Sequence, residues 1–196
     1  MKLIERIDAA RERWNVLEHP FYKRWSCGEL TRGELAHYAG EYRHAVVALA
    51  DTAKKTGHEE HAREETEHVG LRDEFVAAFG AKTDRKPSAE TAECVDAWTA
   101  PENRHEALAV MYAIEAGQPA VSQAKLEGLA EHYGVAVDEP GAEYFALHSE
   151  RDHEHAAESR RELELVHDAD ADRLVEVAEA ALRGNWTLLD GVDARR

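Results

Sequence analysis

One stretch, Tyr144-Phe-Ala-Leu-His148-Ser-Glu-Arg-Asp152-His-Glu-His155, carries the strongest pattern in this sequence. His148, Asp152 and His155 follow one another at spacings of four and three residues. On a helix these spacings place the three side chains along one face, where they can converge on a single point. The aromatic residues at the start of the stretch indicate that this face points to the interior, where an unpaired polar group is costly unless a metal ion or hydrogen bonds satisfy it. The stretch therefore predicts a buried helix that carries metal ligands.

The rest of the sequence is also helical in pattern, because no window shows the sustained alternation of a half-buried strand. Thr31-Arg-Gly-Glu34 has the form of a capping box, and the proline after His19 ends the first helix. Gly117 and Pro119 predict a break inside a longer segment. The expected helices cover residues 1–17, 31–55, 58–79, 88–98, 103–132, 142–166 and 170–183, with a short tail that holds Trp186. About seven helices with short connections predict an all-α, single-domain bundle over residues 1–196.

The composition limits the classes of function. At 196 residues and 22.0 kDa the chain is long enough to bury the core of one domain. A formal net charge of −16 repels phosphate backbones, so we expect no nucleic-acid partner. The basic residues are seventeen Arg and only seven Lys, and such an acidic, lysine-poor surface favours a halophile over an ordinary acidic bacterial protein as the source.

Cysteine usage and hydropathy indicate the compartment. Cys27 and Cys94 lie far apart without a Cys-x-x-Cys spacing, which suggests neither a disulfide framework nor a zinc site. No apolar stretch approaches the roughly 20 residues that cross a bilayer, and acidic residues stand where a signal peptide would be apolar. We therefore expect a soluble cytoplasmic protein with no membrane partner.

Two further helices supply candidate metal ligands. Glu65 and His68 form a Glu-x-x-His pair, the device used in ferritin-like di-iron bundles. Glu64, four residues before His68, is a geometrically acceptable substitute for Glu65. Glu115 lies alone in a strongly apolar run and needs a partner. Each side chain taken singly is more often a surface or salt-bridge residue, but together with the first helix they give three histidines and three carboxylates from three helices.

This set of ligand types predicts the metal. Carboxylates and imidazoles without a thiolate favour iron or manganese over a structural zinc ion. Three carboxylates largely balance the charge of two divalent ions, and two ferrous ions can deliver two electrons to dioxygen. We therefore expect a dinuclear site with two iron ions, or iron and manganese, and dioxygen as the co-substrate.

At these residues the sequence resembles the heme-oxygenase-like di-iron oxidases, relatives of the TenA and PqqC proteins. Within that group it is most similar to the CADD-like p-aminobenzoate synthases, typified by the chlamydial protein associating with death domains, which make p-aminobenzoate for folate without the usual chorismate enzymes. The resemblance covers nearly the whole chain and rests on His19-Pro-Phe-Tyr22-Lys-Arg-Trp25 with Gly28, Tyr38 and Tyr42, Glu65 with His68, Tyr112-Ala-Ile-Glu115-Ala-Gly-Gln-Pro119, Lys125-Leu-Glu-Gly128-Leu and the run from His148 to His155.

The resemblance implies a heme-oxygenase-like helical bundle, often a homodimer, and an oxidase that consumes one of its own tyrosines as the ring and a lysine as the amino donor. Carried over by position, the sacrificial tyrosine is Tyr22, a second redox tyrosine is Tyr38 and the lysine is Lys125. The implied metal ligands are Glu65, His68, Glu115, His148, Asp152 and His155.

The residues themselves allow these roles and also plainer ones. A lysine in an apolar helix has a reason to be neutral and nucleophilic, because desolvation lowers its pKa. The alternative is that Lys125 pairs with Glu115 or extends to water, and that Tyr22 packs its ring and hydrogen-bonds its hydroxyl. One departure concerns the first ligand helix. Some members place the first carboxylate seven residues before its histidine, where this sequence has His61, so Glu65, Glu64 and His61 all stay open.

Other functions remain as alternatives. A TenA-type hydrolase needs a cysteine near the position of Tyr112, where this sequence has none. A PqqC-like metal-free oxidase would keep the fold without needing six ligands. A heme oxygenase would use an early histidine such as His19. A non-enzymatic, partner-binding bundle is the last alternative, but the sequence shows no basic or apolar recognition stripe to support it.

Overall fold

The computed structural model describes residues 2–167 and 170–195, and these residues form helices without any strand. The expectation of an all-α fold is therefore confirmed. The helices are α1 Leu3–Arg13, α2 Pro20–Ser26, α3 Arg32–Ala53, α4 Glu59–Ala78, α5 Ala89–Thr99, α6 Arg104–Glu115, α7 Gln118–His132, α8 Pro140–Leu163 and α9 Ala171–Asp193, with short 3-10 helices at Val16–Glu18 and Lys54–Thr56.

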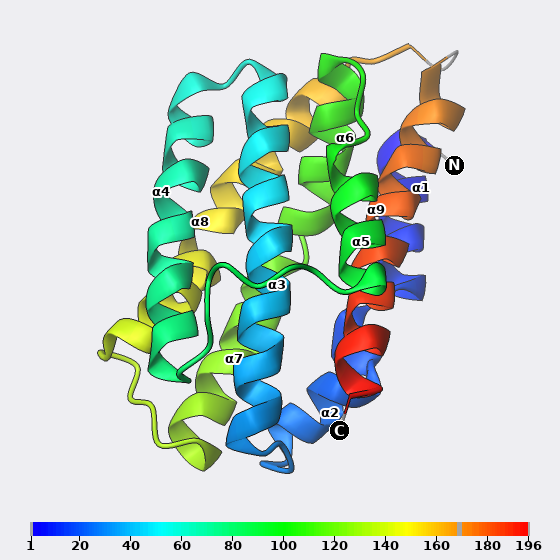
Figure 1. Ribbon diagram of the computed structural model, residues 1–196. Coiled ribbons are helices and arrows are strands. Elements are labelled where there is room, and N and C mark those ends of the chain that lie inside the picture. Colours follow the sequence, from blue (N-terminus) through cyan, green and yellow to red (C-terminus); the bar gives the residue numbers. More distant parts are fainter. Residues whose placement is uncertain (1, 168–169, 196) are drawn as a thin grey trace.

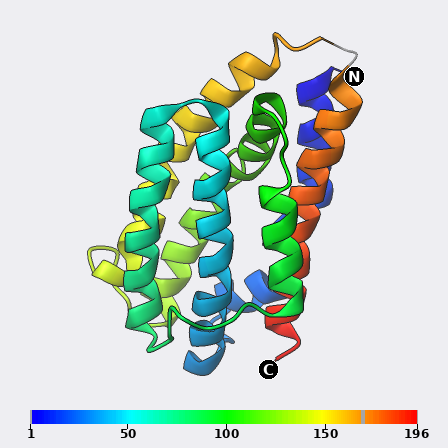
Figure 2. The ribbon, with the colours of Figure 1, turned by 45° about the horizontal axis from the view of Figure 1, so that its top comes forward.

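The long helices surround α8 on three sides. Helix α8 packs against α4, α6 and α7, while α3 packs against α4 and α5 (Figure 1). Helices α1, α5 and α9 form the other side of the bundle, with α9 in contact with α1, α5 and α6 (Figure 2). The buried apolar side chains form one cluster with members from each of these helices. Both ends of the described chain lie on the α1 and α9 side (Figure 1).

Local sequence signals place several helix ends correctly. The Thr31 hydroxyl accepts a hydrogen bond from the Glu34 backbone N–H, and the Glu34 carboxylate accepts one from the Thr31 backbone, which is the predicted capping box. The expected break near Gly117 and Pro119 separates α6 from α7, and Pro119 lies in the first turn of α7. These ends matter for the site, because Glu115 is the last residue of α6.

The prediction for the first helix is wrong in its length. Helix α1 ends at Arg13 rather than near Leu17, and the additional helix α2 begins at Pro20. The His19 ring caps α2 by accepting a hydrogen bond from the Phe21 backbone N–H. Proline at the first helical position is favourable, because its missing N–H has no intrahelical partner there. The proline that was expected only to stop one helix therefore starts another.

The last helix is also longer than predicted. Helix α9 continues through residue 183 to Asp193 and includes Trp186, which was expected in a tail. A Cβ atom on Gly184 would lie 3.2 Å from the Cα atom of Cys94 and 3.3 Å from the Cβ atom of Ala97. Gly184, the first residue after the predicted helix, therefore lies inside α9 at its close approach to α5. Among the described residues, no helix combines the length and apolar character that a membrane span requires.

Candidate metal centre

Helix α4 contributes three buried side chains to the site. His61, Glu65 and His68 are separated by four and three residues, so they share one face of the helix. They are 4%, 1% and 6% exposed. His61, which the sequence left as an alternative to Glu65, lies beside it as an additional group. The spacing of four residues between the two was the signal that could have joined them.

Helix α8 presents its predicted histidine and carboxylate face to α4. His148 and Asp152 are each 1% exposed and His155 is 8% exposed. The Nδ1 atom of His148 lies 2.8 Å from one oxygen of Asp152 and 3.0 Å from the other. This contact orients the imidazole, as carboxylates do for metal-bound histidines, and leaves the Nε2 atom of His148 free.

Glu115 reaches the same space from the end of α6. Its Oε1 atom lies 2.7 Å from the Nε2 atom of His61, without the geometry of a hydrogen bond. Possible ligand atoms fall into two groups, and within each group they lie within 4.8 Å of one another. Glu65 belongs to both groups, as a carboxylate between two ions would. The groups are His61, Glu65, Glu115 and His155, and Glu65, His68 and His148.

The unpaired atoms of these side chains support a metal site. Among the described residues, the buried atoms without a hydrogen-bond partner include His61 Nε2, Glu65 Oε2, both Glu115 oxygens, His148 Nε2 and His155 Nδ1. A buried polar group without a partner is costly, and buried native groups nearly always have one. So many bare ligand atoms facing one another are best explained by cations that bind among them.

The titration behaviour has the same cause. Burial, together with the nearby carboxylates of Asp152 and Glu65, raises the pKa of Glu115 well above its usual range. Burial lowers the pKa of His61 and of His155, so both imidazoles are held neutral. Burial also acts to raise the pKa of Glu65, but its contacts with His68 and other imidazoles outweigh this and lower it. Neutral imidazoles and crowded carboxylates are the groups that a metal ion binds.

Glu64 lies outside this cluster, at its edge. One of its carboxylate oxygens is 3.1 Å from His155 Nε2 and the other accepts a hydrogen bond of 2.7 Å from Arg151. It appears in neither group of possible ligand atoms. Of the three alternatives for the α4 ligand, Glu65 and His61 therefore face the centre, while Glu64 contacts it through His155.

The predicted tyrosines and lysine lie together in an aromatic chamber, which we define as Tyr22, Tyr38, Tyr42, Lys125 and Phe145. The hydroxyls of Tyr22 and Tyr38 are 3.0 Å apart. The Lys125 amine lies 5.2 Å from the centroid of the Tyr22 ring, 4.8 Å from that of Tyr42 and 5.0 Å from that of Phe145. The lysine is fully buried and its amine has no hydrogen-bond partner among the described residues, so it neither pairs with Glu115 nor reaches water.

Burial shifts the pKa values of the lysine and tyrosine side chains in this chamber. Burial and the charge of Arg72 lower the pKa of Lys125 well below its usual range, which favours the neutral amine. Burial, followed by the neighbouring Tyr38 hydroxyl, raises the pKa of Tyr22 well above its usual range. Both shifts favour the uncharged forms, an amine without its extra proton next to a protonated phenol.

Arg72 is a member of this region that sequence reasoning missed. Its guanidinium carbon lies 4.6 Å from the Phe75 ring centroid and 5.1 Å from those of Tyr38 and Tyr42. None of its three guanidinium nitrogens makes a hydrogen bond to a described residue. The spacing of seven residues after Glu65 could have identified Arg72, because it places the arginine on the ligand face of α4.

Ring contacts link the two parts of the site. The Tyr144 ring lies 4.3 Å from the His148 ring and 5.6 Å from the guanidinium carbon of Arg72. Arg72 in turn stacks over Tyr38, which contacts Tyr22. The candidate metal-binding face of α8 and the chamber are therefore linked by buried ring contacts.

Close packing of α2 on α7 brings Tyr22 to Lys125. A Cβ atom on Gly128 would lie 2.5 Å from the Trp25 ring, and the Trp25 indole N–H donates a hydrogen bond of 3.2 Å to the Lys125 carbonyl. Glycine at this position lets the tryptophan lie flat on α7. Since Tyr22 is one turn before Trp25 on α2, this contact seats the tyrosine over the lysine.

In the described structure, the side chains that a heme oxygenase or a TenA-type hydrolase would use are engaged by other groups or lie elsewhere. Both ring nitrogens of His19 are engaged, one by the Phe21 backbone N–H and the other by Asp190 at 3.0 Å, so this histidine is not free to bind heme. Cys27 is exposed, and Cys94 is buried on α5 against α9. The Tyr112 hydroxyl donates a hydrogen bond of 2.8 Å to Asp8, and neither cysteine lies with Tyr112 on α6.

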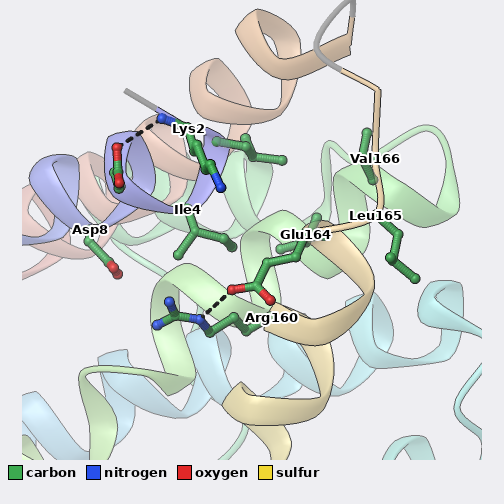
Figure 3. A pocket seen from close by; sticks show the side chains of 10 residues that line it. Lys2, Ile4, Asp8, Arg160, Glu164, Leu165 and Val166 are labelled. Carbon is green, nitrogen blue, oxygen red and sulfur yellow. Dashed lines mark hydrogen bonds and ion pairs between the residues drawn. The ribbon is translucent and has the colours of Figure 1, made fainter.

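The surface also carries a hollow of about 710 Å³ between α1 and the end of α8. Figure 3 shows its lining, in which Arg160 pairs with Glu164 and the apolar side chains of Ile4, Leu165 and Val166 lie around the opening. No candidate ligand or chamber residue lines it. This hollow is therefore separate from the candidate metal centre between α4, α6 and α8.

Known proteins resemble this chain along its whole length. The sequence is 28% identical to a 4-aminobenzoate synthase from Chlamydia muridarum, covering 97% of this chain and 89% of the relative. It is also 28% identical to one from Nitrosomonas europaea, covering 96% and 89%. A heme-oxygenase-like protein of unknown function from Shewanella denitrificans has the same fold, with a TM-score of 0.80 at 20% identity over 99% of this chain and 93% of that one.

A second solved structure, the heme oxygenase-1 of the cyanobacterium Synechocystis in complex with heme, superposes with a TM-score of 0.76 at 15% identity, over 99% of this chain and 93% of that one. The predicted heme-oxygenase-like fold is thereby confirmed. The family model described as iron-containing redox enzyme matches residues 36–188, which include every ligand candidate on α4, α6 and α8. The chain belongs to this family of iron-containing redox enzymes.

Proposed function

We propose that this protein is a dimetal, dioxygen-dependent enzyme that forms 4-aminobenzoate from its own Tyr22 and Lys125. The observation that carries the proposal is the pairing of two sites: a cluster of bare ligand atoms that shares Glu65 between two groups, and a chamber in which a neutral buried amine lies 5.2 Å from a tyrosine ring. Relatives named 4-aminobenzoate synthase, similar over most of the chain, support the product.

The metal ions would be held by His61 and by five of the six side chains expected from the sequence, which are Glu65, His68, Glu115, His148 and His155. Asp152, the sixth, belongs to neither group of possible ligand atoms and would act through His148, whose Nδ1 it contacts. Two ferrous ions, or iron and manganese, would supply the electrons that reduce dioxygen. The remaining chemistry belongs to the chain itself.

Tyr22 and Lys125 have matched roles in this proposal. The Tyr22 hydroxyl hydrogen-bonds with Tyr38 at 3.0 Å, so a Tyr38 that has first been oxidised to a neutral radical can take the phenolic proton and one electron from Tyr22. A neutral Lys125 amine keeps its lone pair available to attack the oxidised ring at the carbon that bears the phenolic oxygen, which would leave as water. Release of the product would then require oxidative cleavage of the Nζ–Cε bond of Lys125 and of the Cα–Cβ bond of Tyr22, with dioxygen as the oxidant. Full burial excludes water, a competing nucleophile, from the same ring.

The test is growth and chemistry in a bacterial folate auxotroph that lacks p-aminobenzoate synthesis. The wild-type protein is expected to restore growth, while Tyr22→Phe and Lys125→Arg are not. Matched controls are Tyr133→Phe, which removes a hydroxyl outside the chamber, and Lys23→Arg, which changes an exposed lysine of α2. Both controls are expected to restore growth.

Two measurements on purified protein sharpen the result. After anaerobic loading with ferrous iron and desalting, retained iron is counted per chain, since a metal-free oxidase would retain none above background. After exposure to air, product is counted per chain, since a chain that consumes its own tyrosine makes no more than one molecule. Growth restored equally by all variants, or many turnovers per chain, would remove the self-consuming mechanism.

A further inference from the structure

The metal centre is bordered by two surface hollows that differ in charge. The first lies between α4 and α8, has a volume of about 500 Å³ and is lined at its inner end by His61 and His155. Five glutamates and two arginines surround it, so it is acidic even when its histidines are neutral. We call it the acidic vestibule, and its glutamates are Glu59, Glu60, Glu64, Glu154 and Glu158.

The second hollow lies between α1, α6, α7 and α8 and has a volume of about 250 Å³. It reaches Glu115 and Asp152 of the metal centre. Apart from these two candidate ligands, the charged groups that line it are Arg11 and Arg160. Each arginine is paired with one carboxylate, Arg11 with Asp8 and Arg160 with Glu164, so the approach to this hollow lacks the excess of glutamates that surrounds the acidic vestibule.

The inner end of the acidic vestibule is built to receive a cation. His61 and His155 are 4% and 8% exposed, and each has a ring nitrogen without a hydrogen-bond partner among the described residues. Glu64 lies between them and solvent, with its side chain 16% exposed and one carboxylate oxygen 3.1 Å from His155. Its other oxygen is held by Arg151, 2.7 Å away.

We propose that the acidic vestibule is the uptake site for divalent metal ions, which Glu64 then transfers to His155 and His61. The inference rests on the metal centre of the proposed function and adds the route by which it is filled. Clefts lined by one sign of charge concentrate the opposite ion and raise association rates. Arg151 competes with the incoming ion for Glu64, so it acts as an exchangeable counter-ion that is displaced on loading.

The experiment measures the rate of metal binding by the full metal-free protein. Protein is mixed anaerobically with ferrous ion at low ionic strength, excess chelator is added at set times, and the metal retained per chain is counted. The test variant is Glu154→Gln with Glu158→Gln, which removes two exposed rim charges of the vestibule. The matched control is Glu143→Gln with Glu150→Gln, which removes two exposed charges from the same helix outside the vestibule.

We expect the test variant to load about 3- to 10-fold more slowly than wild type, in the lower part of the range for electrostatic steering, with the same final metal content. The difference should shrink as salt is added, because surface charges are screened. The control should load at the wild-type rate. Arg151→Gln should load faster, because it frees Glu64, while Arg160→Gln at the other hollow should change nothing.

Other outcomes overturn the route. Equal rates in test and control variants, with full final loading, would reject the vestibule and leave the metal centre intact. Faster loading of Arg160→Gln with no effect of Arg151→Gln would place uptake at the second hollow. Failure of the wild-type protein to retain any metal would reject the metal centre itself, and the route with it.

Discussion

At the scale of single residues, Lys125 shows most clearly how the fold creates chemistry. Its amine is enclosed by Tyr22, Tyr42 and Phe145 without a carboxylate beside it, and the nearest charge acting on it is the cation of Arg72. Both conditions favour the neutral amine. The unfolded chain instead holds a protonated lysine, so we expect folding at neutral pH to release protons from Lys125.

This proton release predicts that Lys125 makes the free energy of unfolding depend on pH. Because the unfolded state binds more protons, its contribution makes the wild-type protein more stable as pH rises, up to the unfolded pKa of about 10.4, with a slope of at most about 1.4 kcal/mol per pH unit. Lys125→Met removes the titrating amine, and with it the free-energy cost of burying that amine. The metal-free variant should therefore exceed wild type in free energy of unfolding at pH 7, by an amount that shrinks at pH 9.

Urea denaturation of both proteins at the two pH values measures the difference. Lys23→Met, at an exposed lysine, is the control and should show no such pH dependence. A Lys125→Met difference that stays constant with pH would mean that the buried amine keeps its proton in the folded protein.

The site residues that could be predicted from the sequence were those whose spacing places them on one face of a helix. His148, Asp152 and His155 share a face because of the helical repeat, and Glu65 with His68 follows the same rule. His61 emerged only as an alternative to Glu65, since nothing in a single sequence says how many side chains a centre recruits. The spacing of Arg72 from Glu65 places it on the same face of α4, but the sequence does not show that it is buried, because its burial depends on rings that α3 and α8 bring to it.

At the scale of elements, the predicted helix bounds were wrong near proline and glycine residues, because such a residue can end a helix, begin one or lie inside one. Pro20 starts α2, and Gly184 sits at the contact of α5 and α9 inside a longer helix. The sequence shows that these residues have unusual backbone preferences. Whether they end a helix or allow close packing depends on the neighbouring helix. Gly128 is the third case, and it bears directly on the site.

Gly128→Ala should separate α2 from α7. Its Cβ atom would lie 2.5 Å from the rigid Trp25 ring, so either the ring or the helix must move. Overpacking of this kind typically costs about 1–3 kcal/mol. We expect that loss in the free energy of urea unfolding, together with lost rescue of the auxotroph, because Tyr22 moves with Trp25.

The matched control is Gly70→Ala on α4, where the added Cβ atom meets nothing within 4 Å. This variant should gain up to about 1 kcal/mol, the usual benefit of replacing a helical glycine. Unchanged stability and full rescue by Gly128→Ala would show that the α2–α7 contact is loose and does not position Tyr22.

At the scale of the whole molecule, acidic residues are in excess over the whole chain and are also concentrated inside the candidate metal centre. The chain carries a net charge of −16, and within it the carboxylates of Glu65, Glu115 and Asp152 lie together between buried histidines that are not all charged. Buried like charges oppose folding unless something compensates them. A bound divalent cation supplies that compensation, so metal binding and folding stability should be linked.

Glu115→Gln should therefore change stability in opposite directions with and without metal. In metal-free protein the variant removes a buried carboxylate beside two others, and stability should rise by about 1–3 kcal/mol, as when buried charges are replaced by neutral groups of similar volume. With manganous or ferrous ion added anaerobically, wild type should gain melting temperature by mass action, and the variant should gain much less. Glu143→Gln on the exposed face of α8 should follow wild type under both conditions. If Glu115→Gln instead destabilises the metal-free protein, the carboxylate is already compensated by His61, 2.7 Å away, and the cluster does not depend on a cation for its balance.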